Sequence, residues 1–288
     1  MQALAPRSAD SLRIVLACVY VDLDGTLLGP GGSLFLGGDG KPSLLGARAV
    51  EACARADVEL CVVTGRKRAS MAELARLLGQ TTAIFEAGAG VLVDGEVHWL
   101  TGEWQPGDAS IHAQIEASGA PALLLEHFAG RLEVHEPWAS GRETSHLLRG
   151  LVDAAEADAL LEQAGFGTLR LLDNGGVHRR SPALAALEQV RAYHLVPRTV
   201  SKAAGVAFHQ QVRGHARKDT IACGDSREDL QMAPTVGTFW LMANAVEHDP
   251  TLRGAVDASD GRVRVSEAGY GGGVYEAVVT TLAEWRPS

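Results

Sequence analysis

Three stretches of the chain are almost continuously apolar and rich in β-branched residues: 13–21, 58–63 and 220–223. Runs of this kind, without a regular polar alternation, are typical of strands that are buried on both faces of a parallel sheet. Residues 42–56 and 71–78 instead space their apolar positions as a helix does. The order strand, helix, strand, helix predicts an α/β fold built on a parallel sheet.

The remaining patterns extend this architecture. Residues 83–85 predict a short third strand, and residues 91–93 with 97–100 predict a hairpin that turns at Asp94-Gly95. Towards the C-terminal end the pattern predicts helices at 183–193, 202–213 and 273–285 and a strand at 238–242.

The pattern changes character in the middle of the chain, where helices are expected at 111–118 and 153–164 and a short strand at 169–172. A length of 288 residues also suits two domains better than one. We therefore predict three parts. They are a loose tail at 1–13, a core domain formed by 14–103 and 180–288, and an inserted α/β cap domain at 104–179.

Composition and charge limit the classes of function. The hydrophobic content of 46% is that of a globular protein with a sizeable core. A net charge of −9 disfavours extended contact with nucleic acid or an anionic membrane, because both require a dense basic surface. The first thirteen residues have no apolar signal core, and no apolar run reaches the ~18 to 20 residues that span a bilayer.

The four cysteines have no CxxC spacing and lie in apolar or helix-like stretches. Buried free thiols are therefore expected, which indicates a cytoplasmic protein. The ten histidines form no HxxxH or HxH pair near a carboxylate cluster, so no zinc site is predicted. The cysteines are Cys18, Cys53, Cys61 and Cys223.

Polar residues follow the predicted parallel strands directly. Asp22 and Asp24 follow the first strand, Thr64 follows the second, and Asp225 and Asp229 follow the run at 220–223. The carboxyl ends of parallel strands open onto one crevice, so these side chains are expected to converge there. Asp24-Gly25 alone would be ordinary turn chemistry, but its place after a buried strand favours a site.

Four ordered motifs of this chain resemble those of the haloacid dehalogenase superfamily. They are Asp22-Leu-Asp-Gly-Thr-Leu27, Thr64-Gly-Arg66, Lys202 and Gly224-Asp-Ser-Arg-Glu-Asp229. The resemblance implies a Rossmann-like parallel core with an inserted α/β cap. It also implies a Mg²⁺-dependent phosphoric monoester hydrolase that acts on a small phosphorylated metabolite.

The resemblance assigns the chemistry to particular residues. Asp22 would attack the phosphate ester and form an aspartyl phosphate, and Asp24 would act first as general acid and then as general base. Mg²⁺ would be held by Asp22, by the backbone carbonyl of Asp24 and by Asp225, with Asp229 supporting the metal or Lys202. Several carboxylates and a phosphate require such a cation, and oxygen ligands suit Mg²⁺.

Three further residues would contact the phosphoryl group. Thr64 would donate from its hydroxyl at a helix start, or it would be only a helix N-cap. Lys202 would place a positive charge beside Asp22, with Lys218 as a rival lysine. Arg66 would bind the phosphate, or it would face solvent.

The position of the insertion resembles a type II cap, in particular that of the Cof-like IIB branch. Gly141-Arg-Glu-Thr-Ser145 and Asp173-Asn-Gly-Gly176 resemble parts of the mannosyl-3-phosphoglycerate phosphatase cap, and sucrose-phosphate phosphatases are more distant. Arg142 and Ser145 are thus candidates for binding a substrate carboxylate or a sugar hydroxyl, the alternative being a surface loop. The implied substrate is a sugar phosphate or a glycosyl-3-phosphoglycerate.

One position departs from the related sugar-phosphate phosphatases, which commonly have Asn where this chain has Glu228. This extra anion keeps open a second class of function, a sugar-phosphate-binding regulator with little turnover. A phosphomutase of the same fold is a further alternative, although its last motif differs. The oligomeric state is left open.

Overall fold

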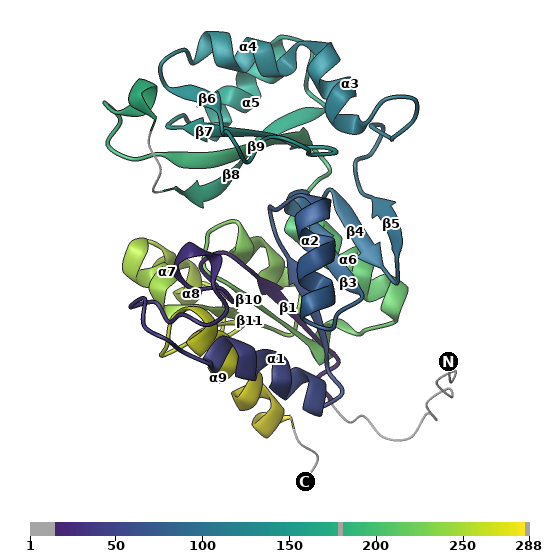
Figure 1. Ribbon diagram of the computed structural model, residues 1–288, viewed down its shortest axis with the longest axis vertical. Coiled ribbons are helices and arrows are strands. Elements are labelled where there is room, and N and C mark those ends of the chain that lie inside the picture. The colour runs from purple at the N-terminus through teal and green to yellow at the C-terminus, as the bar shows by residue number, and fades with distance from the viewer. Residues whose placement is uncertain (1–14, 178–180, 286–288) are drawn as a thin grey trace.

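The computed structural model describes residues 15–177 and 181–285, so the tail predicted at 1–13 lies outside the described residues. Two sheets, one above the other, organise these residues (Figure 1). The eight-stranded sheet lies in the larger part, which contains both ends of the described chain, and the four-stranded sheet lies in the inserted part. The predicted α/β core with an inserted α/β cap is confirmed.

The core sheet has the strand order β12-β11-β10-β1-β2-β3-β4-β5. The pairs from β12 to β3 are parallel, whereas β3, β4 and β5 pair antiparallel at one edge. The strands are β1 (Cys18–Asp22), β2 (Glu59–Val63), β3 (Thr82–Phe85), β4 (Gly90–Val93), β5 (Glu96–Trp99), β10 (Thr220–Gly224), β11 (Thr238–Leu241) and β12 (Val263–Val265).

Helices cover both faces of this sheet (Figure 1). On one face α1 (Leu45–Arg55), α2 (Arg68–Leu77) and α9 (Tyr270–Glu284) bury side chains such as Ala49, Met71 and Val274. On the other face α6 (Lys202–Arg213), α7 (Ala243–His248) and α8 (Leu252–Asp257) contribute a second apolar cluster. Because both faces are covered, β1, β2 and β10 are buried almost throughout, which explains their continuous apolar runs.

The cap is a layer of helices on a four-stranded antiparallel sheet of order β6-β7-β9-β8. Its helices all cover one face of the sheet, while the other face is turned towards the core (Figure 1). The elements are α3 (Ile111–Ser118), α4 (Ala120–His127), β6 (Leu132–Val134), β7 (His146–Gly150), α5 (Ala154–Gln163), β8 (Leu169–Gly176) and β9 (Arg191–Pro197).

The helix predicted at 183–193 is wrong. A short 3₁₀ helix (Pro182–Leu184) is followed by β9, which pairs with β7 and β8. Tyr193 and Leu195 pack under the cap helices, while Val196 belongs to a cluster with Ala87 on the core side. A strand buried on both faces has no polar alternation, so its pattern resembles that of a buried helix. The cap sheet therefore extends beyond residue 179, where the predicted boundary lies.

The two connections between core and cap run side by side. The hydroxyl of Thr199, after β9, donates a hydrogen bond to the backbone carbonyl of Leu100, after β5, at 2.9 Å. The chain thus enters and leaves the cap at adjacent points.

The four cysteines are free and buried, as predicted. No helix among residues 15–177 and 181–285 combines the length and apolar character needed to cross a membrane.

Glu59, at the start of β2, anchors the end of α6 to the sheet. Its carboxylate accepts hydrogen bonds from Thr82 Oγ1 at 3.1 Å, Arg213 Nε at 3.2 Å and His215 Nε2 at 2.8 Å. His209 Nε2 lies 3.4 Å away. Burial alone would raise the pKa of Glu59, but the two histidines and Arg213 outweigh burial and lower this pKa.

Glu59→Gln is expected to lower the free energy of unfolding at pH 7 by about 1 to 2 kcal/mol, allowing for partial solvent screening. A carboxyl whose folded pKa is depressed stabilises the protein above its unfolded pKa, and this contribution is lost as pH falls through the folded value. The difference from the wild type should therefore shrink below about pH 4. Urea unfolding at pH 7 and at pH 3 measures it. Glu51→Gln, on an exposed helix face, is the control, and a pH-independent loss would contradict the prediction.

Candidate active site

The strand ends bring the predicted polar residues to one edge of the core sheet. Asp22 is the last residue of β1, Thr64 follows β2 and Asp225 follows β10. β1 lies between β2 and β10 and pairs parallel with both, with Asp22 opposite Val63. The shared direction of these strands therefore places the three side chains at a common crevice.

Three carboxylates converge at this crevice. One oxygen each of Asp22, Asp225 and Asp229 lies within 4.8 Å of the other two. Asp225 Oδ1 accepts a hydrogen bond from Thr26 Oγ1 at 2.7 Å, and Asp229 Oδ2 accepts from the backbone N–H groups of Asp225 and Ser226, both at 3.1 Å. Oxygen donors held this close together suit a hard divalent cation such as Mg²⁺.

Gly25 is required by this geometry. Its φ is +93°, and a Cβ atom at this position would lie 2.3 Å from Asp225 Oδ2. Only glycine combines this backbone conformation with such a close approach of a carboxylate.

Lys202 lies among the carboxylates. Its buried ammonium is 2.9 Å from Asp22 Oδ1, 2.7 Å from Asp229 Oδ1 and 3.1 Å from Glu228 Oε2. Ser201 caps the N-terminus of α6 by accepting a hydrogen bond from Ala204 N, which fixes Lys202 as the first helical residue.

The structure places the rival lysine elsewhere. Lys218 is exposed in a short 3₁₀ helix (Arg217–Asp219) that precedes β10, at the end of this strand opposite to Asp225. Lys202 is thus the lysine that contacts Asp22.

The crevice holds more acidic groups than basic ones, and burial and this imbalance shift their pKa values. Burial raises the pKa of Asp22 well above its usual range, against the opposing effect of Lys202, and burial also raises the pKa of Asp225 and of Glu228 to about 7. Burial alone would lower the pKa of Lys202. The negative charges of Asp22, Asp229 and Glu228 outweigh burial, so the pKa of Lys202 is raised. Three carboxyl groups contact the one ammonium and a fourth, that of Asp225, lies beside them, so the crevice favours a further cation.

Glu228 lies against Lys202 and is not part of the group formed by Asp22, Asp225 and Asp229. The unusual glutamate therefore adds negative charge beside the lysine.

Thr64 is buried, and its hydroxyl accepts a hydrogen bond from Arg66 N at 3.2 Å. The helix start expected at Thr64 is wrong, as is its alternative role as N-cap, because α2 begins at Arg68 with Lys67 as its N-cap. Arg66 contacts Asp24 through two hydrogen bonds, Nε to Oδ2 at 2.8 Å and NH2 to Oδ1 at 2.5 Å. The predicted phosphate ligand and the predicted acid/base residue are thus paired.

Arg142 and Ser145 join the cap to the core. Arg142 NH1 donates to the carbonyl oxygen of Gly65 at 2.9 Å and to Ser145 Oγ at 3.0 Å. Ser145 is fully buried, and its N and Oγ both donate to Glu86 Oε2, at 2.7 Å and 3.0 Å. The two predicted substrate contacts therefore have structural partners next to the Thr64-Gly-Arg66 loop.

Glu86 is a site residue whose role the sequence did not indicate. It is fully buried in a short 3₁₀ helix (Glu86–Gly88) of the core. Its carboxylate also accepts hydrogen bonds from the backbone N–H groups of Glu143 at 2.8 Å and Thr144 at 3.1 Å, both in the cap. Glu86 therefore fastens a cap loop to the core.

Glu86→Ala is expected to increase amide hydrogen exchange at residues 143–145 by about 10- to 100-fold, since hydrogen bonds to a charged group contribute about 1.5 to 3 kcal/mol. Hydrogen-exchange mass spectrometry measures this change. Glu73→Ala, on the exposed face of α2, is the control. Unchanged exchange at these amides would show that Glu86 does not hold the loop.

Two cap residues that the sequence did not single out face the same loop. A Cβ atom on Gly65 would lie 2.9 Å from His194 Nε2 and 3.2 Å from Asn174 Nδ2. Both ring nitrogens of His194 are buried without a hydrogen-bond partner, and burial lowers the pKa of this histidine well below its usual range. A neutral imidazole and an amide thus form the roof next to the candidate phosphate site.

Comparison with known proteins agrees with this geometry. The sequence profile of the haloacid dehalogenase-like hydrolases matches residues 188–248, the segment that carries Lys202, Asp225 and Asp229. The chain is therefore similar to the haloacid dehalogenase-like hydrolases in this segment. The resemblance predicted from the four motifs is confirmed.

Two relatives that the chain resembles are phosphoglycolate phosphatases. The protein from Halorubrum lacusprofundi is 28% identical over 238 residues, which cover 82% of this chain and 87% of the relative. The protein from Natronomonas pharaonis is 27% identical, with 92% and 97% covered.

Solved structures share the haloacid dehalogenase-like fold with its cap. The sucrose-phosphatase from Synechocystis sp. PCC6803, solved with sucrose and phosphate, is similar with a TM-score of 0.64 and 17% identity, covering 92% of this chain and 98% of that one. A sugar phosphatase of subclass IIB has a TM-score of 0.57 and 17% identity, covering 93% and 98%.

Proposed function

We propose that the protein is a Mg²⁺-dependent phosphoric monoester hydrolase that cleaves a small phosphorylated metabolite through an aspartyl-phosphate intermediate. One observation carries the proposal: the Asp22 carboxylate lies at the strand ends between Lys202 and the oxygens of Asp225 and Asp229. The names of the relatives and of the structural neighbours support the same class of enzyme.

In the proposed first step, an oxygen of Asp22 attacks the phosphorus of the ester in line with the leaving oxygen. A new O–P bond forms as the ester O–P bond breaks, and Asp24 gives its proton to the leaving alkoxide. In the second step Asp24 takes a proton from water as the water oxygen attacks the phosphorus of the aspartyl phosphate. The O–P bond to Asp22 breaks, which releases inorganic phosphate and restores the Asp22 carboxylate. The exposure of Asp24 at the mouth of the crevice suits a residue that exchanges protons with substrate and water.

The donor set fits Mg²⁺. Asp22 and Asp225 would hold the ion together with the backbone carbonyl of Asp24, and Asp229 would support both the ion and Lys202. When bound, the ion would neutralise charge on the transferring phosphoryl group.

Lys202 and Arg66 complete the proposed phosphate site. Lys202 keeps Asp22 oriented through its 2.9 Å contact and offsets negative charge at the phosphoryl group. Arg66 exchanges its two hydrogen bonds with Asp24 for bonds to the phosphate when substrate enters, since a guanidinium fits both groups in the same bidentate geometry. This exchange also frees Asp24 for proton transfer.

The cap would select the substrate. His194 and Asn174 lie above the Thr64-Gly-Arg66 loop, where the organic part of a phosphate ester would be enclosed. A closed cap excludes water and strengthens the electrostatic contacts at the phosphate. The proposed substrates are sugar phosphates, glycosyl-3-phosphoglycerates and phosphoglycolate, small esters that differ in the polar groups presented to this roof.

The test is phosphate release with Mg²⁺ across a panel of phosphoglycolate, hexose and disaccharide phosphates, a glycosyl-3-phosphoglycerate and nucleotides. Release should require Mg²⁺ and stop with EDTA, and one class of small ester should have the highest kcat/KM. Ligand binding without turnover on any member would support the sugar-phosphate-binding regulator instead. Transfer of the phosphoryl group to a second sugar hydroxyl would support the phosphomutase.

A further inference from the structure

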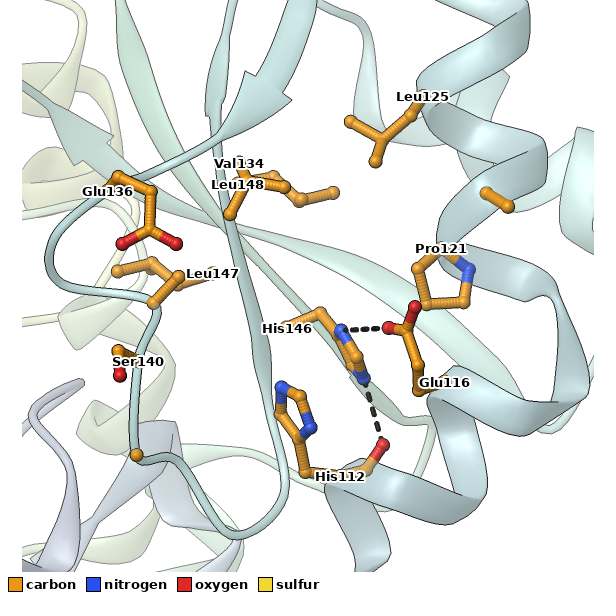
Figure 2. A pocket seen from close by; sticks show the side chains of 13 residues that line it. His112, Glu116, Pro121, Leu125, Val134, Glu136, Ser140, His146, Leu147 and Leu148 are labelled. Atoms are coloured by element: carbon orange, nitrogen blue, oxygen red, sulfur yellow. Dashed lines mark hydrogen bonds and ion pairs between the residues drawn. The ribbon is translucent and has the colours of Figure 1, made fainter.

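Two places in the fold hold polar side chains that the proposed chemistry does not use. The first is a cavity of about 360 Å³ in the cap, between α3, α4 and β7 (Figure 2). There His146 lies 3.2 Å from a carboxylate oxygen of Glu116 and 3.0 Å from the backbone carbonyl oxygen of His112, so its contacts stay within the cap. The second place is at the edge of the core sheet that holds Asp22, and its polar side chain is Asn244.

Asn244 reaches the crevice from a fourth strand end, beside those of β1, β2 and β10. β11 pairs parallel with β10 on the side away from β1, and it ends at Leu241, opposite Gly224. Asn244 follows three residues later, as the second residue of α7. Because parallel strands end at a common edge, this buried amide lies on the same side of the sheet as the carboxylates.

The side chain of Asn244 joins two segments that are far apart in sequence. Its Nδ2 donates a hydrogen bond to the backbone carbonyl oxygen of Gly25 at 2.9 Å, and its Oδ1 accepts one from the backbone N–H of Tyr270 at 2.9 Å. Gly25 lies in the turn that follows β1, and Tyr270 is the first residue of α9. Only 3% of Asn244 is exposed, so water has little access to replace either bond.

The two partners fix the orientation of the Asn244 amide. A backbone carbonyl can only accept and a backbone N–H can only donate, so Nδ2 faces Gly25 and Oδ1 faces Tyr270. The space around the amide is also tight, since a Cβ atom on Gly269 would lie 2.8 Å from Asn244 Oδ1. An ionised aspartate at this position would keep an acceptor for Tyr270 but would have no hydrogen to donate to Gly25.

The turn that Asn244 contacts carries much of the proposed chemistry. Asp24 precedes Gly25 and would supply both its carboxyl group and its backbone carbonyl. Thr26 follows Gly25, and its hydroxyl donates to Asp225 Oδ1 at 2.7 Å. Gly25 has a φ of +93° and wide conformational freedom. A hydrogen bond to its carbonyl oxygen therefore restricts the backbone between Asp24 and Thr26.

We propose that Asn244 is a positioning residue of the hydrolase: its amide holds the turn at Gly25 so that the backbone carbonyl of Asp24 and the carboxylate of Asp225 stay in place to bind Mg²⁺. This inference rests on the proposed function, because it takes the Mg²⁺ site as given. Asn244 acts through Gly25 and not on the ion or the ester. Loss of its amide should therefore weaken Mg²⁺ binding first, as loss of the groups that orient metal ligands commonly does.

The experiment measures Mg²⁺ binding to the full-length protein by isothermal titration calorimetry. Asn244→Ala should bind Mg²⁺ at least about tenfold more weakly than the wild type. The matched control is Gln210→Ala, because Gln210 is a buried amide whose Nε2 donates to the carbonyl oxygen of Thr235 at 2.9 Å and to Thr220 Oγ1 at 3.0 Å, at the end of β10 opposite to Asp225. It should melt at a lower temperature but keep the wild-type Mg²⁺ affinity. Equal Mg²⁺ affinities of the two variants, or no Mg²⁺ binding by the wild type, would overturn the proposal.

A second variant tests the bond to Gly25 alone and serves if Asn244→Ala does not fold. Asn244→Asp keeps the size of the side chain and the acceptor for the N–H of Tyr270, so α9 should begin as in the wild type. The added negative charge would by itself favour a cation. Weaker Mg²⁺ binding by folded Asn244→Asp would therefore point to the lost donor, whereas unchanged or tighter binding would show that this bond does not hold the site.

Phosphate release separates this inference from the proposed function. If the wild type binds Mg²⁺ but hydrolyses no ester, the hydrolase is rejected, and the Mg²⁺ affinities of the variants still test the role of Asn244. If the wild type is active, Asn244→Ala should raise the Mg²⁺ concentration for half-maximal rate by about tenfold, with a smaller change in the KM for the ester. A purely structural role would reduce the amount of folded enzyme and leave both constants unchanged, which would contradict the proposal.

Discussion

Asp22→Asn is expected to lower Mg²⁺-dependent phosphate release by at least about a thousandfold, because an amide cannot form the aspartyl phosphate and only binding and electrostatic stabilisation remain. The change keeps the size of the side chain, and its carbonyl oxygen can still accept the hydrogen bond from Lys202. The fold should therefore persist. Initial rates on the best ester of the panel measure the loss, and thermal melts confirm that the variant is folded.

The matched control for this variant is Asp57→Asn. Asp57 is exposed in the turn between α1 and β2, with a φ of 56° that asparagine also tolerates. Its activity should equal that of the wild type. If Asp22→Asn kept more than about a tenth of the wild-type rate, Asp22 would not be the nucleophile.

Lys202→Met is expected to lower the free energy of unfolding by about 3 to 5 kcal/mol in metal-free buffer, because it leaves the buried carboxyls of Asp22, Glu228 and Asp229 without their cation. The pKa of Lys202 is raised in the folded protein, so its contribution is complete at neutral pH and is lost only as pH rises through that value. Urea unfolding at pH 7 measures the change.

Lys218→Met is the control for Lys202→Met, since it removes an exposed ammonium of the same length. It should change stability by less than about 0.5 kcal/mol. Added Mg²⁺ should recover part of the stability of Lys202→Met, because a divalent cation offsets the same carboxylates. Equal stability of the two variants would mean that Lys202 does not balance the charge of the crevice.

The core could be predicted from sequence because its signals are local. Each parallel strand is a short apolar run, and the residues of the crevice follow directly at the strand ends, as Asp22 follows Val21 and Asp225 follows Gly224. The direction of the strands then brings together residues that are far apart in sequence. The sequence pattern also predicted a helix that begins near Lys202. It did not predict that this helix, α6, is capped by Ser201 and begins where Lys202 contacts Asp22.

The cap was harder to predict because its decisive contacts are not local. β9 is buried on both faces, so its apolar pattern did not distinguish a strand from a helix. The contact between Glu86 and the backbone of residues 143–145 depends on how the two sheets are stacked, which no periodicity records. Thr64 has the residue type of an N-cap, but α2 begins four residues later. His146 and Glu116 meet across a strand and a helix, a pairing without a sequence motif.

The hydrogen bond between Thr199 and Leu100 shows that the two crossings into the cap are neighbours, so the core would close over a short loop if the cap were absent. The cap is thus a single insertion whose two ends leave and re-enter the core at neighbouring points. An insertion of this kind can change in length or sequence without altering the order of the core strands or the carboxylates at their ends. If the proposed function is correct, the residues for the reaction and the residues for substrate choice would thus lie on two separable parts of the chain.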